Sequence, residues 1–87
     1  MSDPDLSIIT ISFNTKDLLR DCINSIYLAA KKLSHEIIVV DNASHDRSAE
    51  LIVTEFKEVT LIKNSQNIGF AKANNQAIRQ VTGKYVL

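Results

Sequence analysis

The run from Ile37 to Val40 is the feature that most constrains the fold of this chain. Four consecutive β-branched residues predict a strand that is apolar on both faces, as in parallel sheets covered by helices on each side. The run leads directly into the polar segment 41–46. Because ligands of open α/β sheets bind at the carboxyl ends of the strands, this junction predicts a binding site.

The spacing of apolar residues predicts the remaining elements. Strands are expected at residues 6–12, 36–40, 59–62 and 85–87. A spacing of three and four predicts one helix over residues 16–33, with Asn14 or Thr15 as its cap, and a second helix capped by Asp46. A third helix is expected from Gly69 to Thr82, ended by Gly83 in the left-handed conformation.

Alternation of strand and helix indicates a Rossmann-like three-layer α/β/α half-domain with a mostly parallel sheet. The chain has 87 residues, of which 45% are apolar, so one core is expected, in residues 6–87 after a tail of residues 1–5. Cys22 and Phe70 are interpreted as core residues. The short last strand would leave a sheet edge exposed, which predicts a larger domain and self-association through that edge.

Charge and apolar runs exclude several classes of protein. Ten basic and ten acidic residues cancel, which argues against a nucleic-acid-binding surface. No stretch approaches the roughly 18 apolar residues of a membrane span, and residues 1–5 do not resemble a signal peptide. We expect a cytoplasmic protein, acting at the inner face of the membrane in its full-length form.

The first loop lacks the glycines of the common phosphate-binding motifs. The turn from Ser12 to Lys16 contains none, so ligand recognition would rely on side chains and exposed backbone amides. Phe13, flanked by Ser12 and Asn14, either holds a flat base or is part of an ordinary turn. Asp41 either accepts the N–H of a pyrimidine base or caps a turn.

Two further groups of polar residues are also compatible either with ligand contact or with a local role in the loop. Asn42 and Ser44 either contact a ligand or bond the local backbone. Asn67 and Gly69 lie at a predicted helix start, which attracts anions. Lys72 opposes the helix dipole in the first turn, so it either contacts a diphosphate or is simply solvated.

Three ordered motifs resemble the start of an inverting family-two glycosyltransferase. They are Ser12-Phe13-Asn14, the segment Val39 to Asp46, and the segment Asn67 to Asn75, and the resemblance covers residues 6–87. It implies a GT-A fold, a nucleoside-diphosphate sugar donor, a carbohydrate or lipid-linked acceptor, and base recognition by Asp41. The paired asparagines of the third motif look most like bacterial cell-surface polysaccharide enzymes, rhamnosyltransferases among them.

The resemblance also implies what lies beyond this sequence. In the family, the acidic motif that binds Mg²⁺ or Mn²⁺ follows the fourth strand, and the catalytic base comes later, so we assign neither here and expect this chain alone to be inactive. An alternative is a non-catalytic nucleotide-binding or receiver-like signalling domain. A receiver needs acidic residues after the first strand and an aspartate after the third, where this chain has Asn14 and Asn64.

Overall fold

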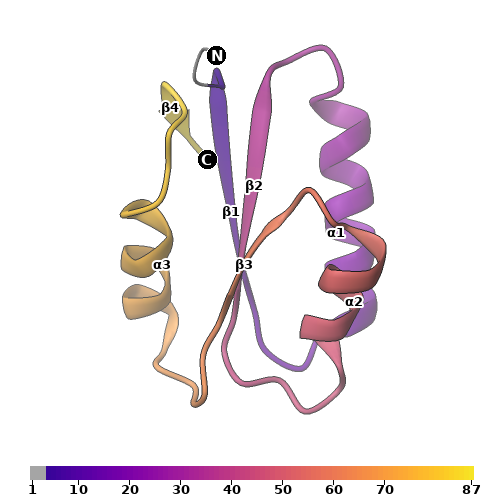
Figure 1. The fold of residues 1–87 in the computed structure, drawn as a ribbon, viewed down its shortest axis with the longest axis vertical. Helices are drawn as coiled ribbons and strands as arrows, with labels where there is room; N and C mark the ends of the chain where they lie inside the picture. The colour runs from indigo at the N-terminus through magenta and orange to yellow at the C-terminus, as the bar shows by residue number, and fades with distance from the viewer. Residues whose placement is uncertain (1–3) are drawn as a thin grey trace.

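The computed structural model describes residues 4–87, in which strands and helices alternate (Figure 1). Residues 1–3 of the predicted tail lie outside the described residues. The elements are β1 (Leu6–Ser12), α1 (Lys16–Ala29), β2 (His35–Asp41), α2 (Ser48–Glu55), β3 (Thr60–Lys63), α3 (Phe70–Ile78) and β4 (Tyr85–Val86). Within residues 4–87, no helix combines the length and apolar character needed to cross a bilayer.

The four strands form one all-parallel sheet in the order β3-β2-β1-β4. In its register Ser12 lies opposite Asp41, and Asp41 lies opposite Lys63. The last residues of β1, β2 and β3 therefore lie opposite one another at one edge of the sheet. This arrangement confirms the predicted α/β class, and it brings three loops to the same edge.

Helices cover both faces of the sheet, with α1 and α2 on one side and α3 on the other (Figure 1). The central strand β2 serves both layers, because Ile37 and Val39 pack beneath α1 and α2 whereas Ile38 and Val40 pack against α3. Each of these four side chains is at most 3% exposed. Burying one such side chain contributes roughly 1.5–3 kcal/mol, so the strand that precedes the polar segment is firmly anchored.

The predicted role of Gly83 as a helix cap is wrong. Helix α3 ends at Ile78, four residues before the predicted Thr82. Gly83 instead packs against β1, where its N–H donates to Ser7 Oγ at 2.8 Å. A Cβ added at Gly83 would lie 2.6 Å from Ser7 Oγ and 2.8 Å from the carbonyl carbon of Leu6, so glycine is needed here for close approach.

Two residues predicted for the core lie at the surface. Phe70 is 72% exposed and Cys22 is also exposed. In α3 the fully buried residues are Ala73 and Ala77, whereas Phe70, at the first residue of the helix, stays exposed. In α1, Ile23 takes the buried position, and the 100° step per residue turns its neighbour outward.

Candidate functional site

The three loops that follow β1, β2 and β3 lie at one edge of the sheet, at the lower end of the view in Figure 1. Among the described residues, all those with a left-handed backbone are in these loops. They are Asn14 (φ 52°), Ala43 (φ 65°), Arg47 (φ 69°) and Gly69 (φ 85°). A non-glycine residue in this conformation costs about 1 kcal/mol, so the loop shapes depend on compensating contacts.

Asn14 joins the first loop to the second. Its Oδ1 accepts the backbone N–H of His45 at 2.7 Å, and its own N–H donates to Ser44 Oγ at 2.9 Å. In the same first loop, the hydroxyls of Ser12 and Thr15 lie 3.3 Å apart. The two loops therefore share hydrogen bonds across about thirty positions of sequence.

Asp41 is buried beneath the second loop, with 1% of its surface exposed. Its Oδ1 accepts the Ser44 hydroxyl at 2.5 Å, and its Oδ2 accepts the Ser44 N–H at 3.2 Å. A carboxylate oxygen has room for two hydrogen bonds, so each retains one acceptor position. The observed contacts are those of a turn, and base recognition by Asp41 stays a prediction.

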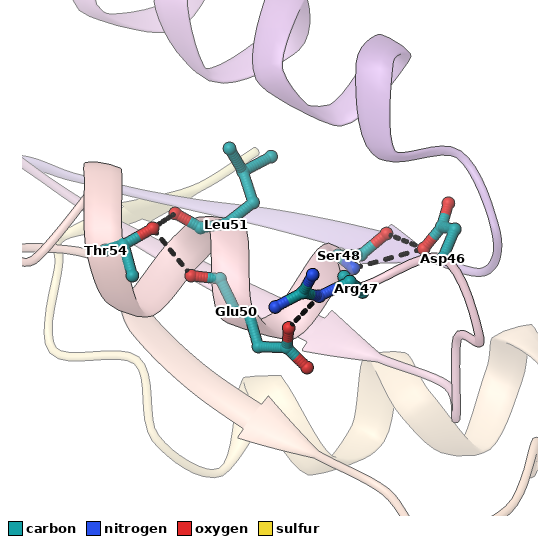
Figure 2. A network of polar contacts seen from close by, with 6 residues as sticks. All are labelled: Asp46, Arg47, Ser48, Glu50, Leu51 and Thr54. Atoms are coloured by element: carbon teal, nitrogen blue, oxygen red, sulfur yellow. Dashed lines mark hydrogen bonds and ion pairs between the residues drawn. The ribbon is translucent and has the colours of Figure 1, made fainter.

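Asp46 links the starts of two helices. Its Oδ2 accepts the N–H of Lys16 at 2.9 Å, at the first residue of α1. Its Oδ1 accepts the N–H of Ser48 at 3.1 Å and the Ser48 hydroxyl at 2.5 Å (Figure 2). The Ser48 hydroxyl, and then the Lys16 and Ser48 amides, hold the pKa of Asp46 below its usual value. The cap position of α2 is held by Arg47, so Asp46 bonds the first N–H of α2 from one residue further out, and Thr15, at the cap position of α1, makes no side-chain cap.

Asn42 joins the second loop to the third. Its side chain is 2% exposed, its Nδ2 donates to the carbonyl of Gly69 at 3.3 Å, and its Oδ1 accepts from Asn64 Nδ2 at 2.9 Å. Asn67 Oδ1 accepts the Gly69 N–H at 2.8 Å. Gly69 is thus held on both of its polar backbone groups at the point where α3 begins.

Asn64 and Gln76 also belong to this region, although neither lies in one of the three sequence motifs. Their side-chain amides form two reciprocal hydrogen bonds. Two sequence features could have pointed to these two residues. Asn64 is a polar residue just past β3, and Gln76 lies three residues after the buried Ala73, on the face of α3 that meets the sheet.

The predicted site residues fall into two groups. Ser12, Asp41 and Asn42 are buried and shape the loops. The others are open to a ligand to differing degrees, and they are Phe13, Asn14, Ser44, Asn67, Gly69 and Lys72. Phe13 is 44% exposed despite its size, which leaves an aromatic ring available at this edge.

The acidic residues of this region do not fit a divalent cation. Among residues 4–87, no group of three or more His, Cys, Asp or Glu side chains is placed to hold a metal ion. The oxygens of Asp41 and Asp46 accept hydrogen bonds from serine and backbone groups instead. Mg²⁺ prefers several oxygen ligands in near-octahedral geometry, so these isolated carboxylates give no such site.

A parallel α/β sheet with polar, mutually bonded loops at its carboxyl edge defines a ligand-binding domain of the Rossmann-like class. The protein family described as "Glycosyl transferase family 2" matches residues 7–87. The chain therefore belongs to glycosyl transferase family 2, which makes its class enzymatic and leaves the receiver-like alternative without support.

The curated relatives of this chain include glycosyltransferases of archaea and bacteria. An uncharacterised glycosyltransferase of Methanocaldococcus jannaschii is 32% identical over 99% of this chain and 31% of its own length. Poly-beta-1,6-N-acetyl-D-glucosamine synthase of Staphylococcus aureus is 31% identical over 94% of this chain and 20% of its own. The chain thus spans less than a third of either protein.

A solved structure shares the fold over nearly the whole chain. The mannosyltransferase PcManGT from Pyrobaculum calidifontis, in complex with GDP-Man and Mn²⁺, superimposes with a TM-score of 0.78 at 28% identity. The match covers 99% of this chain and 27% of that protein. This chain therefore corresponds to part of a GT-A domain.

Proposed function

We propose that this chain forms the donor-binding part of an inverting glycosyltransferase, which uses a nucleoside-diphosphate sugar to extend a carbohydrate or lipid-linked acceptor. The observation that carries the proposal is the side-chain bonding of three neighbouring loops into one surface at the carboxyl edge of the sheet. The GDP-Man complex of the solved relative supports the donor class. The name of the Staphylococcus aureus relative, a poly-N-acetyl-glucosamine synthase, supports polysaccharide or glycoconjugate synthesis. We place this synthesis in the cytoplasm, at the inner membrane face, as part of the same proposal.

The loops have separate roles in this proposal. Phe13 provides an aromatic face for the base, beside the polar groups of Asn14. Asp41 accepts a base N–H through the acceptor positions that its two bonds to Ser44 leave free. The unbonded amides in the first turn of α3, together with Lys72, face the diphosphate.

In the whole enzyme an acceptor hydroxyl would attack the anomeric carbon while the bond to the diphosphate breaks, which inverts the configuration. The hydroxyl proton goes to a general base, and we assign no residue of this chain to that role. The Mg²⁺ or Mn²⁺ expected for the whole enzyme finds no ligand set in residues 4–87. Rhamnose as the sugar stays a prediction that the named relatives do not support.

Titration of the chain with UDP, dTDP and GDP by calorimetry tests the proposal. We expect weak binding of at least one diphosphate, with a dissociation constant in the high micromolar to millimolar range, because the chain spans less than a third of the length of the relatives that it matches. Incubation with a nucleotide sugar should give no turnover. Absence of binding by all three at millimolar concentration would refute the proposed function.

A further inference from the structure

We propose that Asn64 and Gln76 are positioning residues for the donor site, which hold the start of α3 in place for the diphosphate. The inference rests on the proposed function and adds to it two residues that lie outside the three sequence motifs. Neither side chain is fully buried, and both come from elements that flank the third loop.

The two amides form a closed pair. Asn64 Nδ2 donates to Gln76 Oε1 at 3.0 Å, and Gln76 Nε2 donates to Asn64 Oδ1 at 2.9 Å. Asn64 Nδ2 also donates to Asn42 Oδ1 at 2.9 Å, and the Asn64 N–H donates to the carbonyl of Asp41 at 2.9 Å. One asparagine therefore connects the ends of β2 and β3 to the middle of α3.

The side chains of α3 that are fully buried against the sheet are small. The buried stripe of this helix consists of Ala73 and Ala77, both 0% exposed, whereas Phe70 is 72% and Ile78 51% exposed. Alanine side chains let the helix approach the sheet closely, but they interlock weakly with their neighbours. A bidentate amide pair at Gln76 supplies directional contacts that the alanines lack.

The same network reaches the residue at which α3 begins. Asn42 contacts the Gly69 carbonyl at 3.3 Å, and Asn67 contacts the Gly69 N–H at 2.8 Å. Lys72 lies three residues further along, in the first turn. If the amide pair is broken, α3 keeps the contacts of Gly69 with Asn42 and Asn67 but loses the directional contacts at Gln76, so its first turn is held less firmly relative to β2, whereas the first two loops keep their own hydrogen bonds. The loss should therefore affect the phosphates and spare the nucleoside.

Two substitutions at Gln76 separate hydrogen bonding from packing. Gln76→Met keeps the length and volume of the side chain but removes both hydrogen bonds between Gln76 and Asn64, whereas Gln76→Glu keeps an oxygen that accepts from Asn64 Nδ2. Gln80→Met is the matched control at an exposed position just beyond the same helix. Each variant is titrated with UDP and uridine, or with GDP and guanosine, whichever pair the unmodified chain binds.

We expect Gln76→Met, which loses both hydrogen bonds to Asn64, to weaken diphosphate binding about fivefold and to leave nucleoside binding within about twofold. Gln76→Glu should restore only part of the affinity, because it keeps the bond from Asn64 Nδ2 but sets a second acceptor oxygen against Asn64 Oδ1. Amide hydrogen exchange should quicken at residues 70–73 in Gln76→Met and stay slow at Ile38 and Val40, which verifies folding. If Gln76→Met does not fold, Asn64→Asp, which loses the donor to Asn42, is tested by the same criteria.

Three results would overturn the inference. Unchanged diphosphate affinity in Gln76→Met would show that the pair does not position the site. Equal losses for diphosphate and nucleoside would indicate a general structural role. If the unmodified chain binds no nucleotide, the proposed function fails and the donor role of Asn64 and Gln76 fails with it.

Discussion

The side chain of Asn14 accepts a hydrogen bond from the backbone N–H of His45 at 2.7 Å, so that one loop of the candidate site fixes the shape of the next. Asn14 itself has a left-handed backbone (φ 52°), which asparagine tolerates better than most residues. The residue thus satisfies a backbone requirement and a polar requirement at once. Neither role needs a bound ligand, and the loops are therefore organised before binding.

Substitutions at Asn14 should separate these two roles. Asn14→Gly keeps the backbone conformation and loses the bond to His45, and we expect it to lower the free energy of unfolding by about 1 kcal/mol. Asn14→Ala adds left-handed strain and should cost about 2 kcal/mol. Urea denaturation measures both. The control Asn24→Ala, at an exposed site in α1, should stay within about 0.5 kcal/mol of the unmodified chain.

Asp46 should make the stability fall in acid. Its pKa in the folded chain is lowered, first by the Ser48 hydroxyl, from an unfolded value of about 3.9. The ionised Asp46 therefore stabilises the folded chain at pH values above its unfolded pKa. This stabilisation is lost as the pH falls through its folded pKa. Asp46→Asn should unfold more easily at pH 7 and show a shallower loss of stability below about pH 4.

The stability of Asp46→Asn should still fall as the pH is lowered, because the pKa of Glu50 is also lowered by its contact with Arg47 (Figure 2). Asp21→Asn, at an exposed position of α1, is the matched control. Thermal unfolding followed between pH 2.5 and pH 7 compares the three proteins. Parallel curves for Asp46→Asn and Asp21→Asn would contradict the assigned role of Asp46.

Gly83→Ala should destabilise the chain by about 1–3 kcal/mol, because the added Cβ overlaps atoms of β1. Adding Ser7→Ala should not restore stability, since the backbone atoms of Ser7 and Leu6 remain at 2.7 and 2.8 Å. Gly69→Ala provides the comparison, with no atom within 4 Å but a φ of +85°. It should cost about 1–3 kcal/mol through backbone strain alone, because a ψ of 169° at positive φ is a conformation that essentially only glycine adopts. Full stability of Gly83→Ala in urea would disprove the close contact.

Lys72→Gln should weaken diphosphate binding about fivefold at low salt, because a charge-assisted contact is lost. The difference from the unmodified chain should shrink at 0.5 M salt, where charges are screened within a few ångströms. Nucleoside binding should not change. Lys57→Gln, in the loop between α2 and β3 at the opposite edge of the sheet, is the control. Equal effects of the two substitutions would remove Lys72 from the site.

The sequence predicted the sheet well because β2 is unusual: four apolar residues in a row fit only a strand covered on both faces. It failed at Phe70 and Gly83, whose environments depend on how closely α3 and β4 approach β1. Periodicity carries no information on such distances. Asn64 and Gln76 were missed for a related reason, since they are twelve residues apart and meet only after the helix has packed.

The buried position of Asp41 could not be predicted either. A carboxylate after a strand is compatible with an exposed ligand contact and with a turn, and only the fold shows that Ser44 covers it. The predicted convergence of the three motifs followed from the parallel topology, because carboxyl ends of parallel strands share one edge.

The most direct test of the proposed site is to map where a nucleotide binds by NMR. Amide chemical shifts of the ¹⁵N-labelled chain are followed during titration with UDP, dTDP and GDP to millimolar concentration. We predict that the shifts change at residues 12–16, 41–46 and 64–72, on all three loops. No change with any of them, or changes confined to residues 31–34 and 56–59 at the opposite edge, would contradict a donor site at the carboxyl ends of the strands.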